Sequence, residues 1–181
     1  MQPAFEAFPK IPRLNRTIII TEKIDGTNAQ VHVTAEGEVF AGSRNRWITI
    51  ENDNQGFACW VKLHEAELRE GLGIGTHFGE WFGAGIQRRY GLLEKRFSLF
   101  NTHRWKDGQR PAICGVVPTL YIGAFSQAAI QEALDDLRLH GSKAVPGFMN
   151  PEGIIVFHTA SSTMYKKTLK NDEQPKSKVK L

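Results

Sequence analysis

The chain has 181 residues, of which 41% are hydrophobic and 23% charged, so we expect one folded domain that needs no disulfide or metal to hold it together. Its two cysteines, Cys59 and Cys114, lack CxxC spacing, and no apolar run is long enough to cross a bilayer, which excludes zinc frameworks and membrane spans. A net charge of +4, a pI near 9.1 and the lack of a leader-like start permit a polyanionic partner and predict a cytoplasmic protein.

The first forty residues predict an irregular lead-in followed by an antiparallel meander. Three prolines interrupt residues 1–16, and a β-branched run that is typical of a buried strand follows them. Further on, Val31 and Val33 alternate with polar neighbours, as they do in a half-buried strand. The expected strands cover residues 17–20, 29–35 and 39–41.

Two later segments have the period of a helix. Apolar side chains recur at helical spacing over residues 55–69, so we expect an amphipathic helix there that ends at Gly71. A second helix is expected between Ser126, as its N-cap, and Gly141. Short apolar segments of strand length occupy 76–82, 96–100, 116–123, 153–157 and 163–169.

Strands outnumber helices in this pattern and do not alternate with them one for one. The sequence therefore predicts an α+β fold with largely antiparallel sheets flanked by a few helices. The last eighteen residues hold six lysines against Asp172 and Glu173, so most of the net charge lies there. We expect a domain over 1–170 and a flexible Lys-rich tail over 171–181.

Three familiar motifs fail on their spacing. His64 begins an HExxH pattern, but Leu68 stands where the second histidine belongs. Residues 71–76 place a threonine at the third glycine of GxGxxG, and residues 141–143 lack the upstream glycine of a P-loop. These segments are expected to be an ordinary helix face and ordinary loops.

The segment KIDGTN at 23–28 is the strongest candidate for chemistry. Lys23 follows a triple-isoleucine strand and precedes an Asp-Gly turn, which can hold a side chain at a strand end facing a cleft. On these residues alone, a solvated lysine beside a turn is the more common arrangement.

Six segments, in one order, resemble the motifs of the covalent nucleotidyltransferases, which include DNA ligases, RNA ligases and mRNA capping enzymes. KIDGTN resembles the first motif, KxDG, and its threonine and asparagine resemble the nick-sealing RNA ligase 2 type. The remaining matches are GSRNR at 42–46, HFGEW at 77–81, FSLFN at 97–101, PEGIIV at 151–156 and YKKT at 165–168. The resemblance covers about residues 17–170 and implies an ATP-grasp-like nucleotidyltransferase domain.

The resemblance implies three catalytic lysines. Lys23 is the candidate nucleophile, and its amine must be neutral to attack the α-phosphate of ATP. Lys166 and Lys167 are placed against that phosphate, where positive charge would stabilise the pentavalent phosphorus, although a basic surface strand would have the same sequence. The family usually spaces this pair as KxK, which here gives Thr168, so Lys166 is our first candidate.

Glu152 opens a buried strand, where an unpaired carboxylate would be costly, so we expect a metal ion or a lysine beside it. By resemblance it is a ligand of the metal ion or part of the phosphate site. Glu80 is similar to the family glutamate that binds a ribose hydroxyl. Arg44 matches the arginine on the other side of that ribose, with Arg46 as a substitute. A turn acid and a solvated arginine are the alternatives for Glu152 and Arg44.

Phe100 resembles the aromatic residue that stacks on adenine, with Phe97 as a competitor and a core position as the alternative. The family usually has aspartate next, whereas this chain has Asn101. Glu22 and Asn28 are carried over as further nucleotide-binding residues.

The resemblance implies an ATP-dependent RNA ligase that needs Mg²⁺ or Mn²⁺ and forms a lysyl-AMP intermediate. AMP would pass from Lys23 to a 5′-phosphate, and a 3′-hydroxyl would then displace it. The expected partners are RNA ends or nicks, with DNA as an alternative, and a protein that supplies end recognition. About a dozen residues follow the last motif, so we expect no C-terminal OB domain. An adenylyltransferase with another acceptor and an inactive nucleotide-binding or nucleic-acid-binding module are the rival functions.

Overall fold

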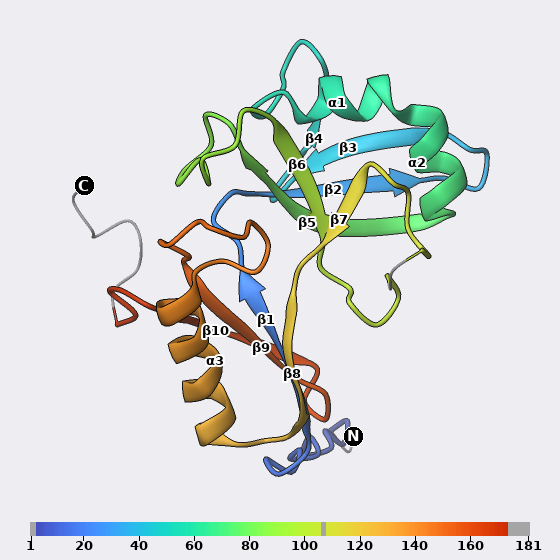
Figure 1. The fold of residues 1–181 in the computed structure, drawn as a ribbon. Helices are drawn as coiled ribbons and strands as arrows, with labels where there is room; N and C mark the ends of the chain where they lie inside the picture. The colour runs from blue at the N-terminus through green and yellow to red at the C-terminus, as the bar shows by residue number, and fades with distance from the viewer. Residues whose placement is uncertain (1–2, 106–107, 174–181) are drawn as a thin grey trace.

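The computed structural model describes residues 3–105 and 108–173, and it has the α+β architecture expected from the sequence. Its strands form a sheet of four and a sheet of six, which we call the small and the large sheet. Figure 1 shows helices α1 and α2 on the outer side of the large sheet and α3 beside the small one. Each sheet therefore keeps one face that these helices do not cover.

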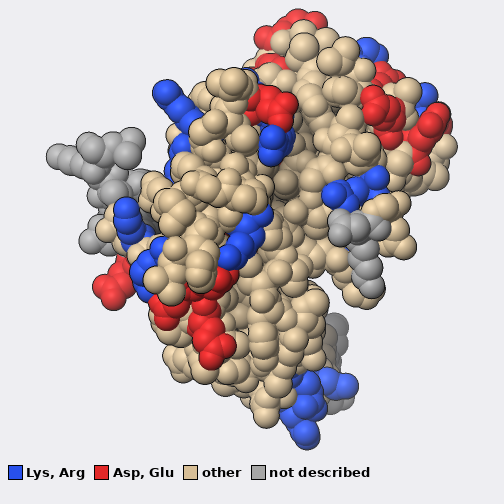
Figure 2. Space-filling model, in the orientation of Figure 1, with Lys and Arg blue, Asp and Glu red and all other residues tan. Residues whose placement is uncertain are grey.

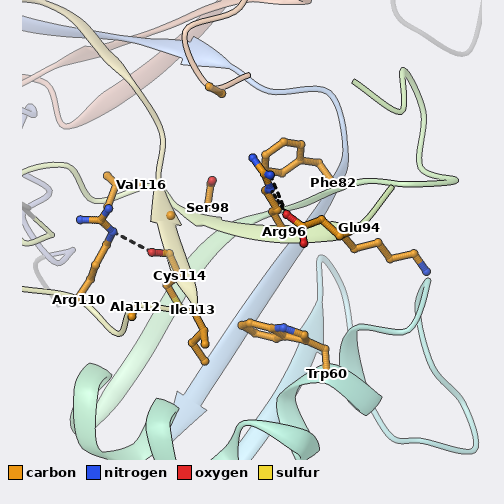
Figure 3. A pocket seen from close by; sticks show the side chains of 13 residues that line it. Trp60, Phe82, Glu94, Arg96, Ser98, Arg110, Ala112, Ile113, Cys114 and Val116 are labelled. Atoms are coloured by element: carbon orange, nitrogen blue, oxygen red, sulfur yellow. Dashed lines mark hydrogen bonds and ion pairs between the residues drawn. The ribbon is translucent and has the colours of Figure 1, made fainter. Parts of the chain in front are cut away.

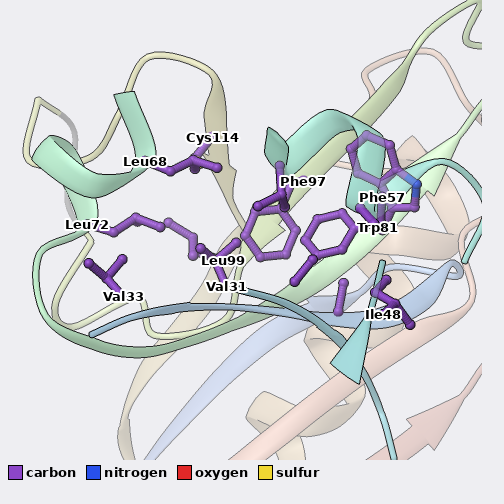
Figure 4. Close-up of a cluster of buried hydrophobic side chains, with 14 of the residues drawn as sticks. Val31, Val33, Ile48, Phe57, Leu68, Leu72, Trp81, Phe97, Leu99 and Cys114 are labelled. Atoms are coloured by element: carbon purple, nitrogen blue, oxygen red, sulfur yellow. The ribbon is translucent and has the colours of Figure 1, made fainter. Parts of the chain in front are cut away.

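The large sheet is antiparallel except where β6 and β7 run parallel. In spatial order its strands are β4 (Trp47–Ile48), β3 (Val39–Ser43), β2 (Thr27–Val33), β5 (Gly75–Gly83), β6 (Lys95–Leu99) and β7 (Cys114–Val116). Helices α1 (Phe57–Leu63) and α2 (Glu65–Leu72) cover one face of it. The rings of Phe57, Trp81 and Phe97 meet in the core beneath α1 (Figure 4).

The small sheet is antiparallel throughout. Its strands, in spatial order, are β10 (Thr163–Thr168), β9 (Gly153–His158), β1 (Thr17–Lys23) and β8 (Thr119–Ala124). Helix α3 (Gln127–His140) packs its apolar side on this sheet. The hydroxyl of Ser126 accepts from the Ala129 N–H, and Gly141 ends the helix at a φ of 75°, so the predicted bounds of this helix are confirmed.

The predicted meander over the first strands is only partly right. Strands β2 and β3 form the expected hairpin, but β1 pairs with β8 and β9 in the other sheet. The Asp25–Gly26 turn carries the chain from the small sheet to the large one. A local pattern cannot reveal this, because the strands that pair with β1 lie about a hundred residues later.

Two other elements are divided where one was expected. The helix over 55–69 is two helices, because the backbone leaves helical geometry at His64, with φ −108° and ψ 23°. The strand over 116–123 is also two, β7 and β8, which belong to different sheets. Pro118 lies between them, and proline has no N–H to donate to a ladder.

A third apolar cluster joins the two halves of the molecule. Ile24, Phe82, Tyr90 and Val117 are buried in it, and Phe100 packs against it. These residues come from the segments that connect the sheets and from the uncovered face of the large sheet, so the cluster fixes how the two sheets meet. Of the predicted tail, residues 174–181 lie outside the described part of the chain.

Candidate active site

Lys23 ends strand β1 and forms an ion pair with Glu152. Its Nζ lies 2.6 Å from Oε2 of Glu152, whose side chain is only 2% exposed, whereas the Lys23 side chain is 20% exposed. The pairing of Lys23 with Gly153 brings the two side chains together from positions 129 residues apart. A buried carboxylate needs a counter-charge, and this lysine supplies one while remaining open to solvent on one side.

The turn after Lys23 is held by contacts from the loop between β5 and β6. Nε of Arg88 lies 2.9 Å from Oδ2 of Asp25, and the main-chain N–H of Asp25 donates to the hydroxyl of Tyr90 at 2.8 Å. A Cβ on Gly26 would collide with the carbonyl oxygen of Trp81, so this position requires glycine. The turn is therefore rigid, and Lys23 takes its position from it.

Glu80 lies on the uncovered face of the large sheet, close to Lys23 and Glu152. Its Oε1 accepts a hydrogen bond of 3.0 Å from the N–H of Gly26. Burial raises the pKa of Glu80 to about 7, against the opposing effects of Lys23 and this hydrogen bond, and the negative charge of Glu152 raises the pKa further. The carboxyl of Glu80 therefore changes its charge near neutral pH.

Register places the predicted site residues of the large sheet in one row. Asn28 pairs with Glu80 and Glu80 pairs with Ser98, so these three side chains lie on the same face. Arg44 is exposed in the turn that follows β3, one residue beyond the pairing of Ala29 with Ser43. The row thus runs from the Arg44 turn across β2 and β5 to β6.

The two candidate lysines of β10 point to opposite faces of the small sheet. Lys166 pairs with Ile155, which pairs with Thr21, so Lys166 shares its face with Thr21 and Lys23. Lys167 pairs with Ile154 and lies on the face that α3 covers. Lys166 is therefore the lysine of this pair that the fold places on the side of the nucleophile candidate.

The carboxylate of Glu22 is directed away from Lys23 and is fully engaged within the protein. The side chain is 1% exposed. Its oxygens accept hydrogen bonds from the Ser142 hydroxyl at 2.6 Å and from the N–H groups of Lys143 and Ala144 at 2.7 and 2.9 Å. This side chain, which the sequence predicts to bind nucleotide, anchors the loop that follows α3.

The structure separates the two aromatic candidates for base stacking. Phe97 is 0% exposed, and its ring lies 5.1 Å from that of Phe57 in the core beneath α1. Phe100 is half-buried on the opposite face, against Ile24 and Phe82. Phe97 is thus a core residue, and Phe100 is the ring that remains accessible.

Arg88 and Tyr90 were missed by the sequence analysis, although both hold the turn after Lys23. Gln87, Arg89 and Tyr90 have positive φ angles of 45°, 58° and 53°, which a loop adopts only when tertiary contacts compensate for the strain. No motif or periodicity marks this segment, and its partners lie more than sixty residues away in the chain.

A cavity of about 480 Å³ lies at the β6–β7 edge of the large sheet, next to this site rather than in it (Figure 3). Ser98 and Phe82 line it from the uncovered face, and Trp60 and Cys114 from the other side. Lys23, Glu80 and Glu152 are not among the residues that line it. The cavity adjoins the row of site residues at Ser98, which pairs with Glu80.

Glu152 is the residue that the sequence predicts to bind a divalent cation. Its buried carboxylate is balanced by the ammonium of Lys23, so a cation would be needed whenever that amine loses its charge. Hard oxygen ligands suit Mg²⁺ and Mn²⁺. Within the described residues, no group of three or more His, Cys, Asp or Glu side chains could hold a metal ion, so most ligands would be water or phosphate oxygens.

The sequence of the chain matches a known protein family over most of its length. A family model described as RNA ligase matches residues 16–174. The chain belongs to the RNA ligase family. The match includes every candidate site residue, from Glu22 to Lys167. A comparison with curated protein sequences finds no significant match.

Solved structures of an RNA ligase from Naegleria gruberi share the fold. A lysine-to-methionine mutant with AMP and Mn has 18% identity and a TM-score of 0.56, over 86% of this chain and 50% of that one. A lysine-to-alanine mutant with ATP and Mn has 17% identity and a TM-score of 0.56, over 85% and 50%. This RNA ligase family member thus spans about half the length of the structures it matches. None of its described helices is long and apolar enough to span a membrane.

Proposed function

We propose that the chain is the adenylyltransferase unit of an ATP-dependent RNA ligase and that Lys23 carries the AMP. In the first step Nζ of Lys23 attacks the α-phosphorus of ATP. An N–P bond forms, the bond from the α-phosphorus to the bridging oxygen breaks, and pyrophosphate leaves. Nζ attacks as a neutral amine and loses one of its two protons to water. The observation that carries this proposal is the 2.6 Å contact between Lys23 and the buried Glu152. It fixes a single amine beside a hydrogen-bond acceptor and leaves its other side open.

Lys166 is the cation that we assign to the α-phosphate. It shares a face of the small sheet with Lys23, and its exposed side chain can reach into the space on that side. Positive charge there offsets the charge that develops on the phosphoryl oxygens during displacement. Lys167, on the face covered by α3, is assigned no contact with the phosphate.

The nucleoside part of ATP is assigned to the row on the large sheet. Glu80 and Asn28 lie on neighbouring strands, where they can bind ribose hydroxyls, and Arg44 closes the row from its turn. Phe100 offers a ring for offset stacking on adenine. Glu22 contributes no side-chain contact, since its carboxylate is engaged by the loop after α3.

Mg²⁺ or Mn²⁺ is the cofactor that we assign to Glu152. The cation would neutralise phosphate charge and balance this carboxylate once Lys23 is bonded to phosphorus. The Naegleria structures with ATP or AMP and Mn support the choice of ligands.

The second and third steps would transfer AMP to a 5′-phosphate and then seal it to a 3′-hydroxyl. We assign RNA ends or nicks as the substrate, with DNA tested beside them, because the chain belongs to the RNA ligase family. The lysines near the C-terminus would contribute phosphate contacts whose strength falls as salt rises. A partner protein could supply end recognition, since the chain spans half of its structural relatives.

A labelling experiment in two stages tests this function. The purified protein is incubated with α-labelled ATP and Mg²⁺ or Mn²⁺, and the label on denatured protein is followed in wild type, Lys23→Ala and Lys95→Ala. Isolated adenylylated protein is then given nicked RNA, nicked DNA and single-stranded RNA with a 5′-phosphate. We expect label on wild type and on Lys95→Ala, and none on Lys23→Ala. We then expect the labelled protein to seal RNA.

Each other outcome separates the rival functions. Label that forms but passes to none of these ends would indicate an adenylyltransferase with a different acceptor. Nucleotide binding without label on any variant would contradict the proposal and indicate a module that only binds.

A further inference from the structure

The face of the large sheet that α1 and α2 leave uncovered carries three exposed aromatic side chains. Phe40, Trp47 and Phe78 are 42%, 54% and 52% exposed, and we call them the aromatic strip. The ring of Trp47 lies 6.0 Å from that of Phe40 and 5.9 Å from that of His32. Neighbouring exposed rings on one face of a soluble domain mark a binding surface, because large apolar patches are otherwise rare there.

Register connects the aromatic strip to the nucleotide site. The N–H of Phe100 donates to the carbonyl of Phe78 at 3.0 Å, so these two rings lie on neighbouring chains of the same face. Phe78 pairs with Gln30, Gln30 with Gly42, and Gly42 with Trp47. With strands about 4.8 Å apart, the row from Phe100 to Trp47 is about 19 Å long.

Between Phe78 and Trp47 the sheet surface carries no large side chain, because one of the two positions there is Gly42. A Cβ on Gly42 would lie 2.6 Å from the side chain of Gln30, so the glycine lets that amide lie across the neighbouring strand. The Gln30 amide itself donates to the carbonyl of Ser43 at 3.1 Å. Phe78 and Trp47 therefore lie on either side of the polar Gln30 side chain, which lies flat over Gly42.

Charge around the aromatic strip favours an anionic partner. Arg44 and Arg46, in the turn that leads into Trp47, are both exposed. Among the described strand residues of the uncovered face, the single carboxylate is that of Glu80, which is buried. Elsewhere the charges are mixed, since Figure 2 shows Lys and Arg interspersed with Asp and Glu over both halves of the molecule. A polyanion thus meets Arg44 and Arg46 at this end of the row, whereas the exposed Glu38 and Glu51 lie in the segments outside its strands.

We propose that the aromatic strip is a stacking platform for unpaired bases of an RNA strand. The proposal rests on the function proposed above and names where the substrate lies. Every base has a flat π-face, so rings on a sheet bind single strands without reading their sequence. The exposed Arg46, next to Trp47, contacts the phosphates. The strip has room for about three stacked bases and continues from Phe100, so a strand lying along it has its end near Lys23.

The test measures RNA binding separately from chemistry. A short single-stranded oligouridylate with a 5′-hydroxyl and a 3′ fluorophore cannot be adenylylated or sealed, and its binding is followed by fluorescence anisotropy without ATP. The double variant Trp47→Ala/Phe78→Ala is expected to lose at least about tenfold in affinity. Trp47→Phe/Phe78→Tyr, which keeps both rings, is expected to bind as wild type does. Leu63→Ala, an exposed apolar residue of α1, is the matched control.

Label transfer from ATP to Lys23 is measured in parallel and is expected to be unchanged in the double variant. An RNA affinity that does not change, in a variant that still forms the adduct, overturns the platform and leaves the proposed function intact. A wild-type protein that binds RNA but forms no adduct fails the proposed function, while the loss of binding in the double variant still supports the platform. The wild-type protein could also be a dimer. If the double variant is then a monomer that binds RNA as tightly as wild type, the aromatic strip is a self-association surface and the proposal is overturned.

Discussion

Lys23 forms an ion pair with Glu152, a partner that is less exposed than the lysine itself. Glu152 keeps 2% of its side chain exposed and Lys23 keeps 20%, so the amine is the more open of the two groups to a ligand. The rigid turn that Asp25 and Gly26 form next to Lys23 prevents the backbone from following the side chain. The amine is thus positioned before any nucleotide binds.

The two lysines of β10 give a matched pair of variants. Lys166→Ala is expected to slow formation of the AMP adduct by about 100-fold, because it removes a cation from the side of Lys23. Lys167→Ala removes the same charge from the opposite face of the sheet and is expected to change the rate by less than about threefold. Rates of label incorporation at saturating ATP check both values. Equal losses in the two variants would contradict the assignment.

Glu80 gives a prediction about pH. Its pKa is raised from 4.5 to about 7, so between these values the folded protein binds a proton that the unfolded chain does not. Stability therefore falls as pH rises through this window, and burying the charged form at pH 8 costs on the order of 3 kcal/mol. Glu80→Gln keeps an acceptor for the Gly26 N–H and is expected to be more stable than wild type at pH 8 and equal to it near pH 5. Urea unfolding at both pH values checks this, and a difference independent of pH would contradict it.

At the scale of elements, Glu22 connects β1 to the loop after α3. Glu22→Gln removes the negative charge that strengthens the hydrogen bonds from the Ser142 hydroxyl and from the Lys143 and Ala144 N–H groups. We expect a loss of about 2–3 kcal/mol in the free energy of unfolding. Faster amide hydrogen exchange is expected at Lys143 and Ala144, whereas Glu132→Gln on the exposed side of α3 should leave both quantities unchanged. Unchanged exchange in Glu22→Gln would show that the loop does not depend on this carboxylate.

The same residue shows what the sequence could have revealed. Strand periodicity over 17–23 already puts Glu22 and Lys23 on opposite faces, so the sequence alone predicts that their side chains point away from each other. The α3 bounds followed from Ser126 and Gly141, because helix caps are local signals. The face of Lys166 could not be predicted, since it depends on register with β9.

Long-range pairing accounts for the other differences. The pairing of β1 and the contacts of Arg88 and Tyr90 depend on segments about sixty to a hundred and thirty residues away. Phe97 and Phe100 both suit a strand, and only the position of α1 decides which ring is buried. Motifs supplied the candidate residues of the site, and tertiary contacts determined which of them share a face with Lys23.

At the scale of the whole molecule, Arg88 joins the segments that lead into both halves of the site. Its Nε binds Asp25 after β1, and its Nη1 donates to the carbonyl of Asn150, shortly before Glu152. Arg88→Ala is expected to lower the free energy of unfolding by about 2 kcal/mol and to raise the KM for ATP in adduct formation. Arg89→Ala, at the exposed neighbouring position, is the control. If the KM for ATP does not change in Arg88→Ala, Arg88 contributes to the stability of the fold and not to nucleotide binding.

The lysyl-AMP bond is the central claim, and peptide mass spectrometry after incubation with ATP and a divalent metal tests it most directly. The account predicts that one AMP unit is added to the peptide containing Lys23, that fragmentation places it on this side chain, and that Lys23→Ala acquires none. No AMP on this peptide in wild type, or AMP on a different lysine, would contradict the account.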